Sequence, residues 1–217
     1  MASYFNLTLD TTAPSGGSIS LPSRASSVNI TATLSATGAT YMKLWGDICA
    51  TAGGTAITEA NASWVAYDTS KAIILTASDG TKTVYAKFKD DVGNESSAVN
   101  ASVIYDSTVP TVTIVGPDVS KISKVSGYNS CAFSFSSSEA FNEWTVRVVP
   151  STSSLHTAGT EIPTTGGSTN MHGTTQTAAS TAVNCTIKGA DLETASSGDG
   201  AKIIKVFVKD LTGNWST

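Results

Sequence analysis

Charged residues are scarce in this sequence. Asp, Glu, Lys and Arg together make up only 14% of its 217 residues, and no long stretch repeats its apolar residues at helical spacing. An amphipathic helix needs apolar residues at a period of about 3.6 and a charged or polar opposite face. The composition therefore argues against a helical protein.

Basic residues are few as well. The chain has 13 Lys and Arg against 17 Asp and Glu, and its pI is about 5.1. Binding to nucleic acid or to an anionic membrane requires a basic surface that neutralises phosphates. We therefore expect neither as a partner, which leaves proteins and carbohydrates. Four aromatic residues could stack on sugar rings, although such rings more often pack in a core or an interface: Trp64, Tyr67, Tyr128 and Trp215.

Histidine is rarer still. His156 and His172 are the only two, and neither lies in a group of cysteines or carboxylates at metal-ligand spacing. The sequence also lacks a nucleophile-elbow pattern, which would place a serine beside a base and an acid. We therefore expect no catalytic residues, no cofactor and no enzymatic activity.

The three cysteines are too few for a disulfide framework. Cys49, Cys131 and Cys185 are odd in number, so at least one thiol stays unpaired within the chain. None falls on an expected sixth strand, which excludes the bridge between sheets that antibody domains carry. We expect buried free thiols, with a bridge between Cys131 and Cys185 as the alternative.

What the sequence does contain is an internal repeat. The stretch "DGTKTVYAKFKDDVGNES" from Asp79 aligns without gaps on "DGAKIIKVFVKDLTGNWS" from Asp199, an offset of 120 residues. "LDTTAP" with Asp10 matches "YDSTVP" with Asp106 at an offset of 96. The second copy therefore holds an insertion of about 24 residues. We expect two domains, at 1–106 and 107–217, with the insertion at 150–180.

Apolar residues alternate with polar ones in short runs, which is typical of β-strands. In "VNITATL" and in "AVNASVIYD" every second side chain is apolar, and Gly-rich or Asp-Gly turns separate such runs. The pattern predicts an all-β fold of two tandem immunoglobulin-like β-sandwiches. We expect Trp45 and Trp144, each on a third strand, between the sheets. The expected strands are 18–21, 28–34, 41–45, 62–66, 72–76, 83–89 and 98–105, then 111–115, 131–136, 143–149, 183–187 and 202–209.

The repeated "KD" and "GN" pairs predict a turn after each sixth strand. Gly93 and Gly213 suit positive φ angles, and the carboxylates of Asp90 and Asp210 can accept hydrogen bonds from N–H groups inside the turn. A functional alternative is a Ca²⁺ site between the domains. Its oxygen ligands would be Asp90, Asp91, Asn94 and Asp106. We prefer the structural role and expect no metal.

The insertion is too long for an ordinary loop. Pro163 and the Gly166-Gly167 pair indicate an elaborated surface hairpin, where contacts with partners are common. We expect His156, Asn170 and His172 to provide such contacts. We also expect that deleting residues 151–177 leaves a folded domain.

The second domain reaches "GNWST" with no residues left for a seventh strand. Either a longer natural chain supplies that strand, or a neighbouring subunit or a rerouted segment at 120–125 covers the exposed sixth strand. In the case of a neighbouring subunit the protein is a homo-oligomer. Its interface would then contain Ile203, Lys205, Phe207, Lys209 and Trp215.

"DTTAP" and "VYAKFKDDVGNES" resemble the Ig-like repeats of bacterial surface proteins and of tailed-bacteriophage virion proteins. "YMKLWGD", "GTEIPTTGGSTN" and the terminal "GNWS" look most like the phage version. The resemblance implies a non-enzymatic virion structural or decoration protein that contacts other virion proteins and attaches weakly to host-surface glycans.

The resemblance also implies a location on the virion surface after assembly in the host cytoplasm. "MASYFNLTLD" has neither the basic nor the apolar region of a signal peptide, which agrees with that route. The alternatives are a fragment of a bacterial cell-surface adhesin and a carbohydrate-binding module.

Overall fold

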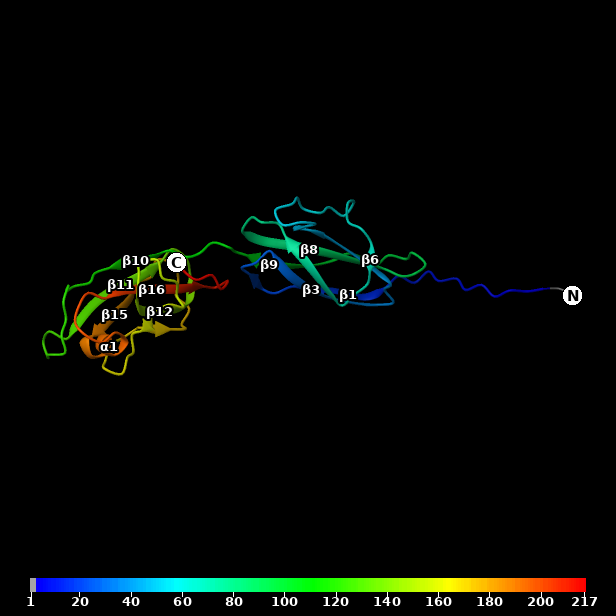
Figure 1. Cartoon of the computed structure of the whole chain (residues 1–217). Helices are drawn as coiled ribbons and strands as arrows, with labels where there is room; N and C mark the ends of the chain where they lie inside the picture. Colours follow the sequence, from blue (N-terminus) through cyan, green and yellow to red (C-terminus); the bar gives the residue numbers. More distant parts are fainter. Residues whose placement is uncertain (1–2) are drawn as a thin grey trace. The chain divides into compact units, whose positions relative to one another are not determined.

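The computed structural model describes residues 3–217 and contains two compact domains. Domain 1 extends to Ser107 and domain 2 comprises Thr108–Thr217, and each is described here by itself. Both are immunoglobulin-like β-sandwiches, so the expected fold class is confirmed. Figure 1 colours the chain by sequence and labels many of the strands of each domain.

Domain 1 is built from two sheets. In both, all neighbouring strands are antiparallel except β2 and β9, which run parallel. The first sheet has the order β1 (Ser15–Ser20), β3 (Asn29–Thr37), β7 (Ser70–Leu75) and β5 (Ile48–Cys49). The second has the order β2 (Arg24–Ala25), β9 (Val99–Tyr105), β8 (Gly80–Lys89), β4 (Tyr41–Gly46) and β6 (Val65–Ala66).

The core of domain 1 follows the two-residue period of its strands. Ala32 and Leu34 point inward from β3, and Val84, Ala86 and Phe88 do so from β8. All five are almost fully buried, and the polar residues between them face outward. Alternation in the sequence therefore locates both the strands and their inward faces.

Domain 2 has the same two layers with additions. One sheet has the order β10 (Val112–Val115), β11 (Ser130–Ser137) and β15 (Val183–Lys188). In the other, β12 (Phe141–Val149) pairs on one edge with β16 (Ile203–Asp210). On its other edge β12 pairs with β13 (Thr160–Glu161) and β14 (His172–Gly173). The helix α1 (Gly189–Ala195) follows β15. Within residues 3–217, no helix is long and apolar enough to span a bilayer.

Only one of the two expected core tryptophans lies between the sheets. Trp144 belongs to the core of domain 2, and its indole N–H donates to the carbonyl oxygen of Asn170 at 3.2 Å. Trp45 is also buried, with 8% of its surface exposed, but it is not between the sheets as expected. Met42 and Leu44 take the inward positions of β4, so Trp45 lies on the other face and stacks on Tyr85, with ring centroids 5.6 Å apart.

The cysteines of the described chain are all free thiols, as expected. Cys49 and Cys185 are buried, and burial raises the pKa of Cys185 to about 12. Cys131 is half-buried, and its pKa is also raised, by burial first and then by the charge of Asp118. High thiol pKa values keep the reactive thiolates of Cys131 and Cys185 scarce, so these two side chains act as small apolar residues.

The insertion at 150–180 is part of the fold rather than a dispensable surface hairpin. Ile162 and Met171 are fully buried in the core of domain 2. The short strands β13 and β14 extend the sheet beside β12, and a Cβ atom at Gly173 would collide with the ring of Trp144. The expectation that residues 151–177 can be deleted without loss of folding is therefore wrong.

We predict that Ile162→Ala lowers the free energy of unfolding of domain 2 by about 2–5 kcal/mol, because it removes buried methyl groups and leaves a cavity. The matched control is Leu155→Ala in the same insertion, where the side chain is exposed, and there we expect a change within about 0.5 kcal/mol. Urea unfolding monitored by amide exchange along β12 measures the change for both variants. Equal effects would contradict the core role of the insertion.

Candidate interaction surfaces

The repeated motif forms the same hydrogen-bonded turn in both domains. In domain 1, Asp90 Oδ1 accepts from the N–H groups of Val92, Gly93 and Asn94 at 3.1, 2.7 and 2.8 Å. Its Oδ2 accepts from the side-chain amide of Asn94 at 2.7 Å. The structural interpretation of Asp90 is confirmed, because both carboxylate oxygens have partners inside the turn.

Asp210 repeats this arrangement in domain 2. Its Oδ1 accepts from the N–H groups of Thr212, Gly213 and Asn214 at 2.7, 2.6 and 2.9 Å. Its Oδ2 accepts from the side-chain amide of Asn214 at 2.8 Å. Gly93 and Gly213 adopt φ angles of 101° and 107°, which favour glycine.

The residues considered for Ca²⁺ are not brought together. Asp106 follows Tyr105, and Tyr105 pairs with Gly80 at the start of β8. Asp90 follows the other end of the same strand, and Asp91 beside it is exposed. The length of β8 therefore separates Asp106 from the rest of the proposed ligand set.

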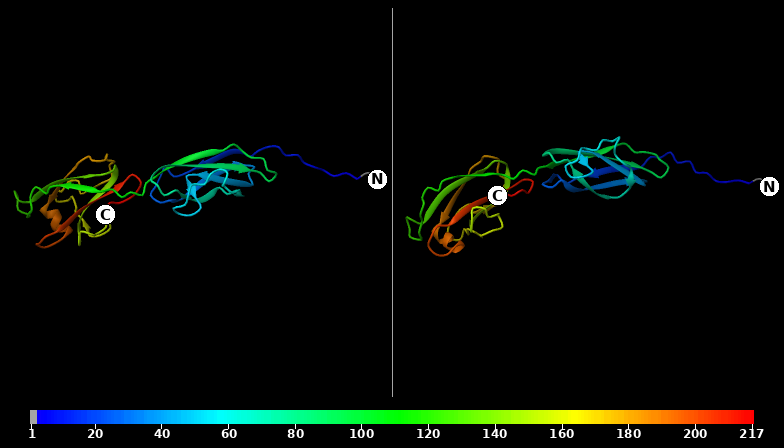
Figure 2. Two further views of the ribbon diagram at one scale, coloured as in Figure 1. Left: turned by 90° about the horizontal axis from the view of Figure 1, so that it is seen from above. Right: turned by 45° about the horizontal axis from the view of Figure 1, so that its top comes forward.

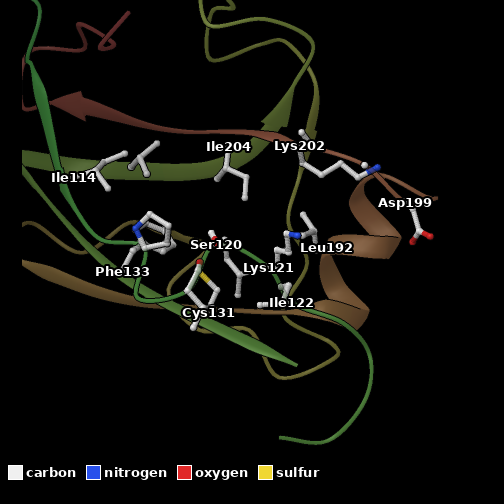
Figure 3. Close-up of a pocket in the computed structure, with 16 residues that line it drawn as sticks. Ile114, Ser120, Lys121, Ile122, Cys131, Phe133, Leu192, Asp199, Lys202 and Ile204 are labelled. Atoms are coloured by element: carbon white, nitrogen blue, oxygen red, sulfur yellow. The ribbon is translucent and has the colours of Figure 1, made fainter. Parts of the chain in front are cut away.

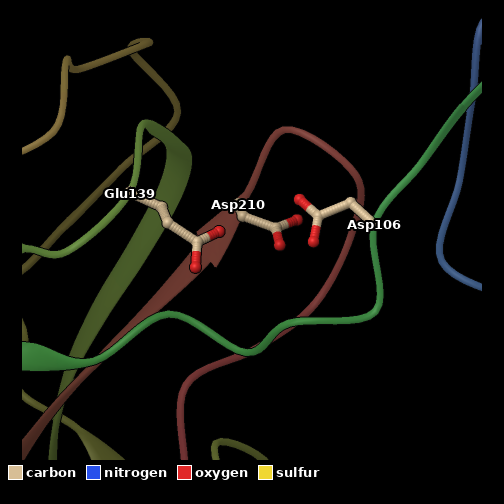
Figure 4. Close-up of side chains that lie close together, drawn as sticks. All are labelled: Asp106, Glu139 and Asp210. Carbon is tan, nitrogen blue, oxygen red and sulfur yellow. The ribbon is translucent and has the colours of Figure 1, made fainter. Parts of the chain in front are cut away.

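Two acidic residues of domain 2 do lie close together. Glu139 and Asp210 offer carboxylate oxygens within 4.8 Å of each other, as Figure 4 shows in a view that also draws Asp106. The oxygens of Asp210 already accept hydrogen bonds from its own turn. Because both oxygens of Asp210 are already occupied, the closeness of these two carboxylates does not by itself define a metal site.

The pKa of Asp90 makes the turn sensitive to pH. Burial would raise this pKa, but hydrogen bonds from Asn94, Gly93 and Val92 outweigh it and lower the pKa below the ordinary 3.8. The ionised carboxylate is therefore favoured by folding. Its stabilisation is present above about pH 3.8 and is lost as the pH falls through the lower value in the folded state.

We predict that Asp90→Asn destabilises domain 1 near neutral pH, because an amide would place donors against the side-chain amide of Asn94. The difference from the unsubstituted protein should shrink as the pH falls below about 3.8. Urea unfolding at a series of pH values measures it. Asp91→Asn, which alters an exposed neighbour, is the control and should have little effect. A difference that stays constant into acid would show that shape, not charge, matters.

The expected interface of domain 2 is largely covered by its own insertion. Phe207 is fully buried on the outward side of β16, and His156 contacts its ring edge-on. His156 also stacks on Trp215, with ring centroids 4.4 Å apart. Lys205 Nζ donates to the carbonyl oxygens of Thr152 and Ser154, both at 2.9 Å. Phe207 is therefore unavailable to a partner, contrary to expectation.

Other expected contact residues also serve domain 2 itself. Lys209 forms an ion pair with Glu143 at 3.0 Å. Asn170 adopts a φ of 58°, and its side-chain amide donates to the carbonyl oxygen of Asn184 at 2.6 Å.

Some of the expected contact residues remain accessible. Ile203 keeps 38% of its surface exposed. His172 contacts Glu161 at 2.8 Å, but most of its side chain is exposed. Asn170 is exposed as well, although its side-chain amide is bound to Asn184.

The four aromatic residues considered for sugar stacking lie in different settings. Trp215 is covered by His156, and the hydroxyl of Tyr67 accepts from the N–H of Ala36 at 3.0 Å. Tyr128 is strongly exposed. Trp64 is half-buried in a cluster that the sequence analysis did not identify.

That cluster is the aromatic face of domain 1, defined by Tyr41, Lys43, Trp45, Trp64, Tyr85 and Lys89. The ammonium groups of Lys43 and Lys89 lie 5.0 and 4.6 Å from the centroid of the Trp64 ring. Lys89 also lies 5.2 Å from the ring of Tyr41, and Lys43 lies 5.7 Å from that of Trp45. Cation–π attraction therefore holds Trp64 against the sheet.

Acidic residues balance the lysines beside this face. Lys87 contacts Glu95 at 2.9 Å and Glu59 at 3.6 Å, and Lys43 contacts Glu59 at 3.4 Å. The hydrogen bond to Glu95 raises the pKa of Lys87, and the same bond lowers the pKa of Glu95. Both shifts favour the charged forms of Lys87 and Glu95.

The aromatic face combines open rings with charged hydrogen-bonding groups. Tyr41 and Tyr85 are each more than a third exposed, and Tyr85 is fixed from below by Trp45. Flat rings beside ammonium and carboxylate groups suit a ligand rich in hydroxyls, which can stack and form hydrogen bonds at once. The sequence signal was the alternation of aromatic residues and lysines at 41, 43 and 45 and at 85, 87 and 89.

Comparisons with solved structures find only weak likenesses. Chitinase ChiA74 from Bacillus thuringiensis matches 93% of this chain, which covers 30% of the chitinase. The identity is 13% and the TM-score is 0.35. Fibronectin(III)-like modules of Clostridium thermocellum CbhA match 92% of this chain and 90% of theirs, at 14% identity and a TM-score of 0.41.

A third likeness is to a tetra-tandem repeat from the extending region of a large adhesion protein. It covers 95% of this chain and 48% of that one, at 19% identity and a TM-score of 0.30. No family model and no curated protein sequence matches the chain. At these TM-scores the likenesses carry no argument about function.

Proposed function

We propose that this is a non-enzymatic structural protein whose immunoglobulin-like domains make subunit contacts on the surface of a tailed-bacteriophage virion. The resemblance of its repeat motifs to phage Ig-like domains supports the virion assignment. A bacterial cell-surface adhesin is the alternative. The structural observation that supports a non-enzymatic role is that the buried polar side chains of the described residues form hydrogen bonds within the protein itself.

Those polar groups hold loops in place. Asp191 illustrates this, because its carboxylate accepts from the N–H groups of Gly166 and Ser168 at 2.6 and 2.8 Å. Burial would raise its pKa, but the hydrogen bonds from Ser168, Gly166 and Thr165 outweigh that effect and lower it. Within residues 3–217, every buried side-chain nitrogen and oxygen has a hydrogen-bond partner. Active sites commonly contain polar groups poised for a substrate instead.

We predict that antibodies against the isolated chain label intact phage particles released from cells that produce it. Electron microscopy with gold-conjugated antibody, and mass spectrometry of gradient-purified particles, check this. The control is a particle preparation from cells that lack the gene. Recovery of the protein in the cell-envelope fraction, with unlabelled particles, would contradict the virion assignment and favour the adhesin.

We propose attachment to glycans as a second function, because the aromatic face of domain 1 presents open rings beside charged groups. Tyr41 and Tyr85 would stack on sugar rings, and Lys87 and Glu59 would bind hydroxyl groups. A role as a carbohydrate-binding module is a variant of this proposal. Both variants place the ligand on the outer side of β4 and β8.

We predict that Tyr85→Ala weakens binding to any glycan that an array identifies by about 3- to 10-fold, since an aromatic contact is worth about 0.5–1.5 kcal/mol. Tyr128→Ala, which removes an exposed tyrosine of domain 2, is the matched control and should bind normally. An array without any bound glycan, or equal losses for both variants, would contradict the proposal.

A further inference from the structure

Domain 1 shows which strand completes a sandwich of this kind. β9 lies between β8 and β2, antiparallel to the first and parallel to the second. Val103 and Tyr105 of β9 point into the core and are only 1% and 6% exposed. The strand therefore supplies both backbone pairing and apolar side chains.

Domain 2 has an open slot at the corresponding position. β16 is the counterpart of β8 at an offset of 120 residues, and its first edge pairs with β12. Along its other edge, the described residues contribute only the end of the chain, where Trp215 bridges Lys209 and Ser216 bonds to Val208. Among the described residues, no strand pairs with the part of β16 before Val208 on that edge, although β10 of the facing sheet lies close to β16.

A cavity of about 980 Å³ lies along this part of β16 (Figure 3). One wall is β16 itself, with Ile204, and Ile122 lies across the cavity from it (Figure 3). Val206 and Val119 also line the cavity. Residues 120–125, expected as a covering strand, form no strand in the described chain, and only 120–122 line the cavity. The cavity is therefore a slot between two stretches of backbone, with an apolar interior.

The N-terminal segment, residues 3–10, exposes apolar side chains, whereas the slot of domain 2 offers an apolar cavity. It belongs to no strand in the described chain and extends away from the sheets of domain 1 in all three views (Figures 1 and 2). Phe5, Leu7 and Leu9 alternate with polar residues, and each is more than 80% exposed. Exposing three large apolar side chains to water is unfavourable, and apolar residues gathered on a surface commonly mark a site that binds a partner.

The N-terminal segment also carries the sequence pattern of β9. The offset of 96 residues aligns Leu7 with Val103, and Leu9 with Tyr105. It aligns "DTTAP" with "DSTVP" directly after the strand. The side-chain amide of Asn94 donates to the carbonyl oxygen of Asp10 at 3.3 Å, which ties the base of the segment to domain 1.

We propose that the N-terminal segment of one copy of this chain inserts as a β-strand into the slot of domain 2 of a second copy. The strand runs antiparallel to β16 and beside residues 119–122, as β9 runs beside β8 and β2. The pairing of β9 with β8 then places Phe5 opposite Ile204, Leu7 opposite Lys202 and Leu9 opposite Gly200. The apolar side chains fill the slot, and the exposed edge of β16 gains a partner.

A polar contact at the end of the slot supports the same register. In domain 1, Ser107 donates from its N–H and its hydroxyl to Asp79 at 3.0 and 2.9 Å. At the offset of 96 residues Ser107 corresponds to Thr11, and at the offset of 120 residues Asp79 corresponds to Asp199. Asp199 is exposed at the mouth of the slot (Figure 3), where the hydroxyl of an incoming Thr11 can reach it.

We infer a second copy of this chain as the occupant of the slot, because every copy carries the matching N-terminal segment. Each copy carries one donor segment and one slot, and these are different surfaces. The contact is therefore heterologous and can repeat from copy to copy. It goes beyond the proposed function, because it holds for an adhesin as well as for a virion protein.

The first experiment compares Leu7→Asp with Thr8→Asp in the full chain. Both positions lie in an exposed segment, so neither substitution should affect folding, but only residue 7 would face the slot. Sedimentation over a range of concentrations should show association of the unsubstituted chain. Leu7→Asp should weaken that association at least about tenfold, while Thr8→Asp should leave it nearly unchanged.

Amide exchange gives an independent readout of the same association. Exchange at residues 203–207 should slow as the concentration of the unsubstituted chain rises, and should not slow for Leu7→Asp. A chain that stays monomeric up to about 1 mM, or equal effects of the two substitutions, would overturn the proposal.

The second experiment tests the register by cross-linking. One chain carries Phe5→Cys and another carries Ile204→Cys, both with Cys131→Ser. Directly opposed residues in an antiparallel pair are close enough for a disulfide. We expect a bridge between the mixed chains, and none when Asn6→Cys replaces Phe5→Cys. A single chain carrying both cysteines that bridges only within itself would overturn the second copy as the donor.

Discussion

Closure of the sandwich is the constraint on which this structure depends. Two sheets can hide their inward side chains only if every strand position along the shared core is filled, and an uncovered edge strand invites pairing with another chain. Domain 1 satisfies the requirement with β9, whose Val103 and Tyr105 fill the core. Domain 2 satisfies it on one side through the insertion, whose Ile162 and Met171 pack beneath β12. The edge of β16 is where the requirement stays open within the described chain.

The repeated turn explains why both copies keep the same polar residues. The carboxylate of Asp90 or Asp210 fixes the turn, and the serine that follows is thereby placed back on the sixth strand. Ser96 Oγ accepts from the N–H of Phe88 at 3.0 Å, and Ser216 Oγ accepts from the N–H of Val208 at 3.1 Å. The turn thus directs the chain along the edge that a seventh strand would cover. Its conservation between the copies is a consequence of folding and does not require a metal.

The strands could be predicted from the sequence because alternation records which side chains face the core. β9 was expected at 98–105 and is found at Val99–Tyr105, and β16 was expected at 202–209 and is found at Ile203–Asp210. The role of the insertion could not be predicted, since Ile162 and Met171 are isolated in a Ser-, Thr- and Gly-rich stretch and form no period. Trp45 was misplaced because it follows Leu44 directly, and only one of two adjacent apolar residues can face inward. The aromatic face depends on Trp64, which no local pattern connects to Lys43 and Lys89.

The proposed strand donation changes how the stability of the two domains must be understood. Domain 1 contains all the strands of its own sandwich, so its free energy of unfolding should not depend on the concentration of the chain. Domain 2 would be completed by another molecule, and binding to the folded state alone stabilises that state by mass action. Its free energy of unfolding should therefore rise with concentration. Crowding many copies into one assembly would strengthen the domain that joins them, so assembly and folding of domain 2 would support each other.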